Sequence, residues 1–526
     1  MSNSSGRFFW KAVLSCAGAV ALGAVGVGYL WLPKQDPPYV PQPKPFIAQT
    51  VEATDQQAHE MCAACHAYTD PSNFPRSVWR SQVENGYEFL AKAHLPLHPP
   101  PREQMVHYFE NRAPKSLPQV PDTDRTEPCP VRFQPVRFRE PGVAHPVISN
   151  VNLVHLSSQK RLDLLACDMG TGNVMLMKPY EASPHFQILA KLGHPGHTQV
   201  VDLDGDGIKD ILVADLGEFH PTDAKVGRVI WLRGHADGTY TPYTLLSGVG
   251  RVTDVEMADF DGDGLNDLAV AEFGHERTGS ILWLQNRTKD WSHPKFIPHQ
   301  LDSRAGTIHV PVCDLNHDGR PDFTALISNE YETVVAFINQ GGGRFVEKTI
   351  FTGSSPALGS DSIQLTRLSP TQKPGVLYAA GDMFDTAVPR SLQGIYWLGD
   401  HGSYPYTTRK LTTMYGAMRA VAADVNHNGR LGVFAVSLTP DLRRWLKPAT
   451  LDSIIYLDQR KDGSFERYAL EKGSCNHATC DAGDIYGDGK TDLVTGNFNF
   501  GSTPDQTAVT LWRNVGRRSV SVASRR

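Results

Sequence analysis

The sequence predicts a mainly β fold in which seven four-stranded units close into a ring, a seven-bladed β-propeller. Three observations predict it. An acidic motif recurs through most of the chain, short apolar and aromatic runs follow the copies, and an orphan strand precedes the first unit. A small all-α domain and an N-terminal transmembrane helix are predicted in front of the ring.

The composition is ordinary for a globular chain. Of the 526 residues, 40% are hydrophobic and 20% charged, and the formal net charge is −5. This charge gives no reason to expect a nucleic-acid partner. The 46 glycines and 37 prolines favour many turns over long helices.

The N-terminal region is predicted to be a membrane anchor. Residues 12–32 form an uncharged apolar run whose 21 residues span roughly 31 Å as a helix, about the thickness of a bilayer core. Basic residues within 1–11 predict a cytoplasmic N-terminus, so the rest of the chain faces the periplasm or the cell exterior from the inner membrane. A cleaved signal peptide is the alternative. Residues 33–50 are Pro-rich and predict a stiff linker.

The next segment, residues 51–113, carries the motif Cys62-Ala-Ala-Cys65-His66. C-x-x-C-H is the attachment signature of haem c, in which both thiols bond to the haem and the histidine is the proximal iron ligand. A zinc site would need a second ligand pair, and a thioredoxin-type pair would need a βαβ context. The sequence offers neither, so it favours covalent haem.

This segment resembles a small monohaem cytochrome c domain. Helices are expected over residues 56–66, 77–93 and 102–113. Cytochromes c of this type usually place a methionine, as the second axial ligand, in the loop before the last helix. Here that loop reads "HLPLHPPP", and His98 takes the place of the methionine. Met105 is not the expected ligand, because it lies on the last helix and not in the loop before it. The alternatives to His98 are His94 and an iron with no second axial ligand from the protein.

After a linker over residues 114–130, the acidic motif recurs through residues 131–516. Intact copies begin at Asp202, Asp259 and Asp314, weaker ones at Asp424 and Asp484, and decayed ones at His155 and Arg367. Successive starts are 47, 57, 55, 53, 57 and 60 residues apart, which gives seven units.

Each unit continues with an apolar run, then an aromatic-bearing strand such as "RVIWL" from Arg228, then a more polar strand. About four short strands per unit are typical of a propeller blade. The last unit lacks an outer strand, and the polar tail over residues 517–526 cannot supply one. The orphan strand "VRFQPVRFR" from Val131 would complete that blade and close the ring.

The acidic loops have the spacing of calcium sites. Oxygen ligands at loop positions 1, 3, 5 and 9, with a backbone carbonyl at position 7, suit Ca²⁺. An EF-hand is excluded because its glutamate at position 12 is here Val213. The alternative is a polar turn closed by side-chain-to-backbone hydrogen bonds, which is expected for the loops at Asp424 and Asp484. The predicted calcium ligands are Asp202, Asp204, Asp206, Ile208 and Asp210; Asp259, Asp261, Asp263, Leu265 and Asp267; and Asp314, Asn316, Asp318, Arg320 and Asp322.

These repeats resemble the FG-GAP/VCBS family of bacterial surface propellers, over about residues 131–514. The resemblance implies a propeller with bound calcium and does not bear on whether the protein is an enzyme.

Together these features predict a membrane-anchored, extracytoplasmic electron-transfer protein with haem c and Ca²⁺ as cofactors and a redox protein as partner. One alternative is an adhesion propeller that binds glycan or protein, with the haem as a sensor. Another is an oxidoreductase whose site lies in the propeller channel, where histidines gather near adjacent loops at positions His194, His197, His220, His275 and His309. Cys475 and Cys480 could form a disulfide in an oxidising compartment.

Overall fold

The computed structural model describes residues 51–64, 67–93, 97–116, 129–369, 373–381, 389–439, 451–499 and 506–517. The predicted cytoplasmic segment, membrane anchor and Pro-rich linker, residues 1–50, lie outside these ranges. Within the described part of the chain, no helix has both the length and the apolar character needed to span a bilayer.

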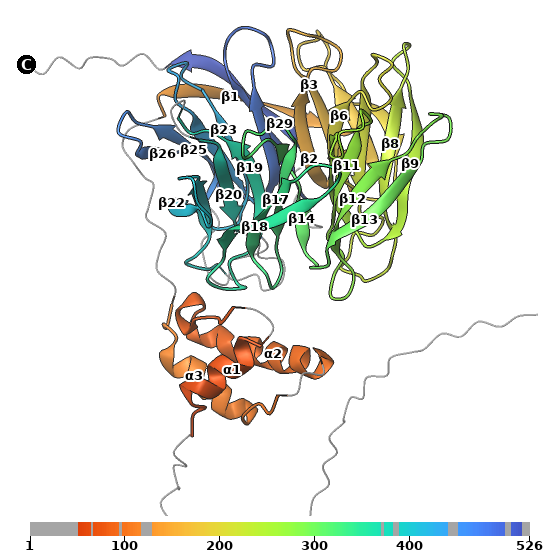
Figure 1. The fold of residues 1–526 in the computed structure, drawn as a ribbon. Helices are drawn as coiled ribbons and strands as arrows, with labels where there is room; N and C mark the ends of the chain where they lie inside the picture. The colour runs from red at the N-terminus through yellow and green to blue at the C-terminus, as the bar shows by residue number, and fades with distance from the viewer. Residues whose placement is uncertain are drawn as a thin grey trace, which may run out of the picture. The chain divides into compact units, whose positions relative to one another are not determined.

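The described residues between 51 and 116 form a small helical domain (Figure 1). Its three α-helices are α1 (Asp55–Cys62), α2 (Trp79–Ala93) and α3 (Arg102–Arg112), with short 3₁₀ turns η1 (Pro71–Asn73) and η2 (Arg76–Val78) between the first two. A capping box starts α1, because the Thr54 side chain accepts from the Gln57 amide and the Gln57 side chain accepts in return from the Thr54 amide. Each α-helix lies where the sequence predicts one.

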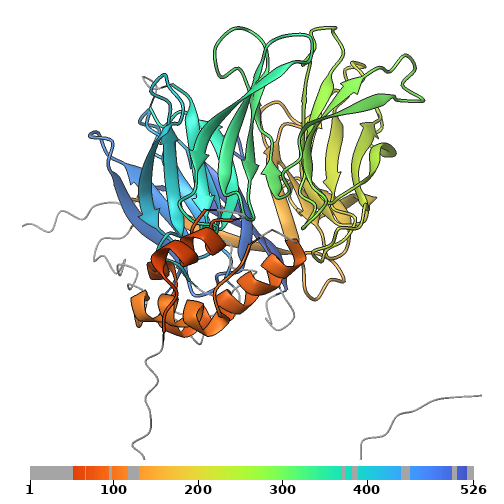
Figure 2. The same ribbon diagram turned by 60° about the horizontal axis from the view of Figure 1, so that its bottom comes forward.

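Aromatic stacking holds the helical domain together. The indole of Trp79 stacks on Phe109 with ring centroids 4.0 Å apart, and its Nε1 donates to the carbonyl of Pro71 at 3.0 Å. Met105 is fully buried beside them, on α3. Figure 2 shows α1, α2 and α3 from a second direction. The three helices therefore share one apolar core, to which α1 contributes Ala58.

Seven antiparallel sheets form the propeller. In six of them, four strands pair side by side in the order in which they occur in the chain, and the seventh combines strands from both ends of the propeller. The first three sheets are β2 (Ile148–Val154), β3 (Asp163–Asp168), β4 (Asn173–Met177) and β5 (Gln187–Lys191); β6 (Pro195–Val201), β7 (Asp210–Asp215), β8 (Gly227–Gly234) and β9 (Tyr240–Val249); and β10 (Val252–Ala258), β11 (Asp267–Glu272), β12 (Ser280–Asn286) and β13 (Phe296–Asp302).

The next three sheets follow the same order. They are β14 (Thr307–His309), β16 (Asp322–Ile327), β17 (Thr333–Asn339) and β18 (Phe345–Thr352), with the two-residue β15 (Val312–Cys313) also paired to β16; β19 (Ser360–Thr366), β20 (Gly375–Ala380), β21 (Gly394–Gly399) and β22 (Thr407–Thr413); and β23 (Ala417–Ala423), β24 (Gly432–Ser437), β25 (Asp452–Gln459) and β26 (Phe465–Lys472).

The seventh sheet closes the ring. It contains β27 (His477–Gly483), β28 (Asp492–Asn497) and β29 (Thr507–Arg517), and its outer strand is β1 (Val131–Arg139) from the other end of the propeller. The innermost strand β2 contacts both β6 and β27. The seven units and the closing strand predicted from the repeats are thus confirmed.

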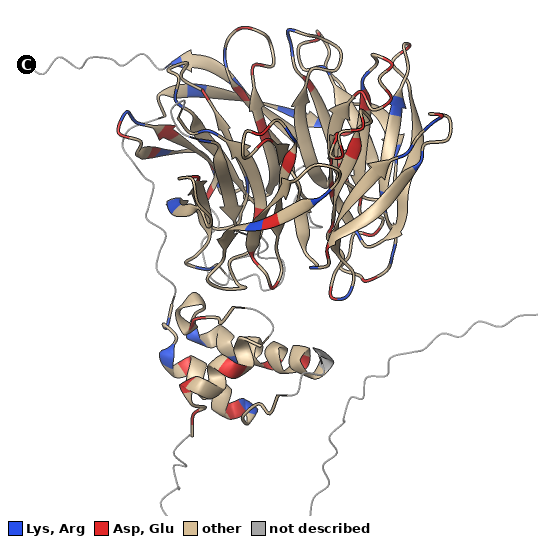
Figure 3. Ribbon diagram, in the orientation of Figure 1, with Lys and Arg blue, Asp and Glu red and all other residues tan. Residues whose placement is uncertain are grey.

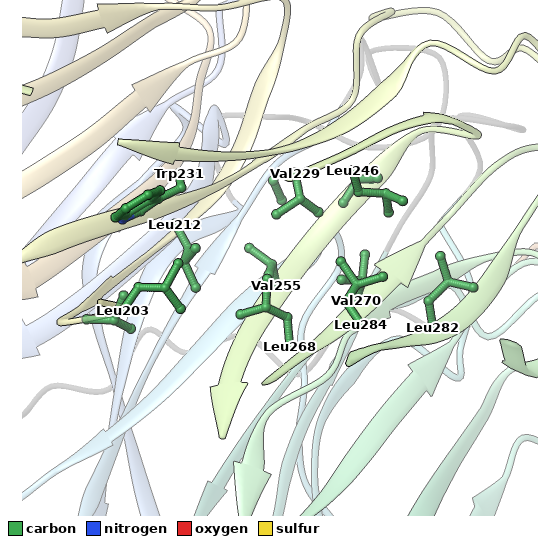
Figure 4. Packing of buried hydrophobic residues seen from close by; sticks show 13 residues of the cluster. Leu203, Leu212, Val229, Trp231, Leu246, Val255, Leu268, Val270, Leu282 and Leu284 are labelled. Carbon is green, nitrogen blue, oxygen red and sulfur yellow. The ribbon is translucent and has the colours of Figure 1, made fainter. Parts of the chain in front are cut away.

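The second strand of each sheet has two buried faces. In β11, all six residues are buried. Leu268 and Val270 pack toward the second sheet, beside Leu212 and Trp231 (Figure 4), whereas Ala269 and Ala271 pack toward the fourth. Side chains alternate between the two faces of a strand, so a strand enclosed by sheets on both sides is apolar in its middle, as Leu268 to Ala271 are here.

Charged residues of both signs are interspersed over the propeller strands and loops (Figure 3). This distribution agrees with the small net charge of −5.

Replacing residues 131–139 with a Gly/Ser segment of equal length should destabilise the propeller by about 3 kcal/mol or more. The exchange leaves β29 unpaired along its outer edge and removes Phe133, whose ring packs edge-on against Phe434 at 5.6 Å. Chemical denaturation of the full chain measures the effect. Val136→Ser is the matched control, because Val136 on the same strand is 39% exposed and should change stability by at most about 0.5 kcal/mol. Equal stability of both proteins would show that ring closure does not depend on β1.

Candidate functional site

The acidic loops join the first and second strands of their sheets and share one backbone conformation. The fourth loop residue has a positive φ in all five recognisable copies: Gly205, Gly262, His317, His427 and Gly487. The sixth residue is a left-handed glycine in each. The first aspartate accepts a hydrogen bond from that glycine, as Asp202 does from Gly207 at 3.1 Å and Asp484 does from Gly489 at 2.8 Å. The loop fold is therefore the same in intact and degenerate copies.

Two loops also gather three carboxylates around one point. Oxygens of Asp202, Asp204 and Asp206 lie within 4.8 Å of one another, and those of Asp259, Asp261 and Asp263 do the same in the next sheet. Oδ1 of Asp202 is buried and has no hydrogen-bond partner among the described residues. An unpaired buried carboxylate oxygen beside two further carboxylates suits a hard cation such as Ca²⁺.

A basic side chain from the third strand of the same sheet lies beside each carboxylate group. Arg233 Nη2 lies 2.6 Å from Oδ2 of Asp204, whose side chain is 0% exposed. Arg287 Nη1 lies 2.6 Å from Oδ2 of Asp263. The guanidinium groups offset part of the repulsion between the carboxylates, and they occupy oxygens that a bound cation would use.

The ninth loop position, predicted as a ligand, holds the loop to its sheet. Asp267 is fully buried and accepts hydrogen bonds from the Asn286 amide at 2.7 Å, the Trp283 indole at 2.9 Å and the Phe260 amide at 3.3 Å. Burial raises the pKa of Asp267 to about 6. Asp210 and Asp322 are buried likewise and accept from backbone amides of the same two neighbouring segments. Sequence reasoning missed this second role.

The third loop differs in detail. Nδ2 of Asn316 donates to Asp318 at 2.9 Å, and Arg320 pairs with the same carboxylate. The Arg320 amide also donates to Asp318, as the amides of Ile208 and Leu265 donate to Asp206 and Asp263 at the seventh positions of their loops. Asp314 repeats the bond of the first position to Gly319 at 3.0 Å.

The described part of the C-x-x-C-H motif ends α1. Cys62 packs against the core of the helical domain together with Met61, Tyr68 and Tyr87. Burial raises the pKa of the Cys62 thiol to about 11. Cys65 and His66, as well as the alternative ligand His94, lie outside the described residues. His98 is exposed in the segment before α3.

The five channel histidines do not form one group. His220 is 81% exposed, and Nδ1 of His194 lies 2.6 Å from the Met169 carbonyl oxygen. His197 and His309 do lie together, with ring centroids 6.1 Å apart, on either side of Asp254. The sequence signal for Asp254 is its position five residues before an acidic motif, where His197 and His309 also stand.

The two cysteines considered as a disulfide pair are free. Cys475 and Cys480 are buried thiols, and the Cys475 amide donates to Ser453 Oγ at 3.0 Å. The disulfide that the sequence allowed between them is therefore not formed in this structure. Cys480 lies in strand β27, and Cys475 lies in the turn before that strand and has a positive φ.

Asp267→Ala should destabilise the propeller by about 3 kcal/mol or more, with or without calcium. It leaves three buried donors without an acceptor, each at a cost of roughly 1–3 kcal/mol. Denaturant unfolding in chelator checks this. Asp263→Ala is the control in the same loop, because its carboxylate is partly exposed and should cost about 1 kcal/mol or less in chelator. A similar loss in both variants would remove the distinction between the two positions.

Comparison with known proteins agrees with the repeat pattern. Residues 202–270 and 259–325 match the FG-GAP-like repeat, and the three intact loops fall within them. No curated protein matches the chain. Two solved structures of BBS1N in complex with ARL6DN, soaked with mercury and with lead, are similar at 12% and 11% identity; each alignment covers 74% of this chain and 99% of that one, with TM-scores of 0.45 and 0.44. The seven-bladed propeller therefore carries FG-GAP-like repeats.

Proposed function

We propose that this protein is a membrane-anchored, extracytoplasmic electron-transfer protein. Residues 12–32 would anchor it, the Cys62–His66 motif would attach haem c, and the propeller would dock a redox partner. When bound, haem c supplies one-electron chemistry, while the protein sets the iron ligands and the burial of the group. In this role the protein passes electrons to or from its partner and converts no substrate of its own.

The observation that carries this proposal is the C-x-x-C-H motif at the end of α1. The thiol of Cys62 faces an apolar core with Tyr68 and Tyr87 beside it. A haem bonded there through Cys62 and Cys65 would have aromatic rings to cover one edge. His66 is the proposed proximal ligand. His98 is the proposed distal ligand, because it stands in the Pro-rich segment directly before α3, where the resemblance to cytochrome c places that ligand.

Cys62→Ala combined with Cys65→Ala should abolish covalent haem, because the two thioether bonds need both sulfurs. Haem staining of the full chain after denaturing electrophoresis is the measurement. Cys313→Ala in the propeller is the matched control and should remain haem-positive at the wild-type level. A haem-positive band in the double variant would refute the attachment site, and a haem-negative wild type from a host that matures c-type cytochromes would refute the proposed function.

The calcium part of the proposal rests on the carboxylate groups. In the first intact loop, Asp202 Oδ1 has no hydrogen-bond partner in the described chain, and Asp204 and Asp206 lie beside it. Asp202, Asp204 and Asp206 would hold the ion with the carbonyl of Ile208, and the corresponding residues would do so in the next two loops. The cation would stabilise the fold by neutralising like charges that the strand–loop–strand connection forces together.

Removing calcium should lower the melting temperature of the propeller. At calcium about ten times above Kd, linkage gives roughly 1.4 kcal/mol per site, so about 4 kcal/mol for three sites. Thermal melts with and without chelator measure the loss, and Asp204→Ala should remove about a third of it. The haem spectrum should not change, because the loops belong to the propeller.

Two variants sharpen this test. Asn426→Ala alters the corresponding position of a degenerate loop, where Asn426 bonds to Asp458 at 2.6 Å, and should lower both melts equally. Arg233→Gln removes the cation beside Asp204, so it should widen the difference between the two melts. Melts that are insensitive to chelator would reduce these loops to structural turns.

A further inference from the structure

The innermost strands of neighbouring sheets bring one repeat position together around the centre of the ring. Five residues before the acidic motif, the second, third, fourth and sixth units carry His197, Asp254, His309 and Arg419. These residues lie on β6, β10, β14 and β23. Because the units are related by the ring, equal positions in the repeat face the same central space.

Three metal-ligating side chains meet there. Single ligand atoms of His197, Asp254 and Glu256 lie within 4.8 Å of one another. Nδ1 of His197 is 2.6 Å from Oδ1 of Asp254, yet this buried nitrogen makes no properly directed hydrogen bond within the described residues. The side chain of Asp254 is 2% exposed. A buried imidazole nitrogen this close to one carboxylate and beside a second has the donor set of a metal site, in which an ion would replace the direct contact between His197 and Asp254.

The outer partners fix the ligands in place. Oδ2 of Asp254 accepts from the Val310 amide at 2.8 Å and lies 3.4 Å from Nδ1 of His309. Glu256 accepts from the side chain of Gln199. Oδ1 of Asp254 also accepts from the Val255 amide at 2.9 Å, and a carboxylate oxygen that accepts one hydrogen bond keeps a second lone pair for an ion. Such supporting contacts orient the ligands of metal sites.

The cluster contains two carboxylates, Asp254 and Glu256, which a positive charge would stabilise. Among the described residues, Arg419 is a basic group close to the cluster, with Nη1 3.4 Å from Nε2 of His309. An oxygen of Asp254 and one of Glu256 lie within 4.8 Å of each other and of a ring nitrogen of His197. Two carboxylates this close repel each other when both are ionised and no cation is bound. A divalent cation would stabilise both carboxylates in the ionised form.

We propose that His197, Asp254 and Glu256 bind one divalent first-row transition-metal ion, with His309 as a positioning residue. Imidazole with carboxylate ligands suits Zn²⁺, Fe²⁺ or Mn²⁺ better than Ca²⁺. With metal–ligand bonds of about 2.0–2.2 Å, ligand atoms stand roughly 3.3 Å apart, so His197 and Asp254 need to separate only slightly. The site lies on the innermost strands of the second and third sheets, and it shares no residue with the proposed haem and calcium sites.

Equilibrium dialysis of the full chain against Zn²⁺, in excess calcium and with metal counted by mass spectrometry, tests this site. The wild type should bind one equivalent more than His197→Ala/Glu256→Gln. His309→Ala should keep the stoichiometry but bind about 10- to 100-fold more weakly, as expected for a supporting contact. Excess calcium keeps zinc from the acidic loops, and the background from other sites is common to all the proteins.

His220→Ala is the matched control, because His220 is an exposed histidine of the same blade; it should bind like the wild type. Glu256→Gln alone keeps the size of the side chain and serves if the double variant does not fold. It should lose the same equivalent while retaining the wild-type circular dichroism spectrum. Equal zinc content in the wild type and in folded Glu256→Gln would overturn the proposal, and so would a loss of zinc in His220→Ala.

Discussion

The whole propeller depends on the two-sided burial of its central strands. A strand such as β11 carries Leu268 and Val270 on one face and Ala269 and Ala271 on the other, and both faces are buried. A single sheet of this kind cannot fold alone, because either face would be exposed to water at about 25 cal/mol per Å² of apolar surface. Every sheet therefore needs two neighbours, and only a closed ring provides them for all seven.

The same constraint explains the two features that hold the ring's ends. The outer strand of the last sheet comes from β1, so the first and last residues of the propeller are paired within one sheet. The inner strands are also linked, since Asp481 on β27 accepts from the Leu153 amide on β2 at 2.8 Å. Equivalent links join Gln199 to Met257 and Gln364 to Ala422. Closure is therefore made at the rim and at the centre.

The acidic loop contains a buried structural aspartate and a group of carboxylates in one short segment. Its ninth residue is buried and fixed by donors from the loop itself and from the third strand, as for Asp267. Its third and fifth residues lie beside a basic side chain, and the fifth is the more exposed of the two, as Asp263 is compared with Asp261. The degenerate loop at Asp424 keeps the backbone conformation and the bond to Gly429 at 2.9 Å although it has Asn426 and Asn428. Loss of ligand groups thus leaves the turn intact, which is why copies with different numbers of carboxylates coexist in one ring.

Much of the fold could be predicted from the sequence because the repeats are visible locally. Their spacing gave seven units, and the missing outer strand of the last unit identified the role of residues 131–139. The structural role of Asp267 could not be predicted, because an aspartate at the position of a calcium ligand can equally accept hydrogen bonds from buried donors. Asp254 and Glu256 escaped notice for a different reason: the partners that give them meaning, His197 and His309, are about fifty residues away on either side and meet them only when the ring closes.

Ring closure also separates the chemistry of the channel from the stability of the fold. Each inner strand is held mainly by its pairing with the second strand of its own sheet, as β10 is by β11, so the residue five places before the motif is free to vary between units. That position is Asn150 in the first unit, His197, Asp254 and His309 in the next three, and Arg419 in the sixth. Substitution at one repeat position therefore assembles a mixed set of nitrogen and oxygen groups at the centre without altering the apolar layers between the sheets. The histidine–carboxylate cluster, with His309 beside it, lies on one side of the ring, across the second to fourth units. All seven units have the same arrangement of strands, so this one-sided position results from the different residues that the units carry at equivalent positions.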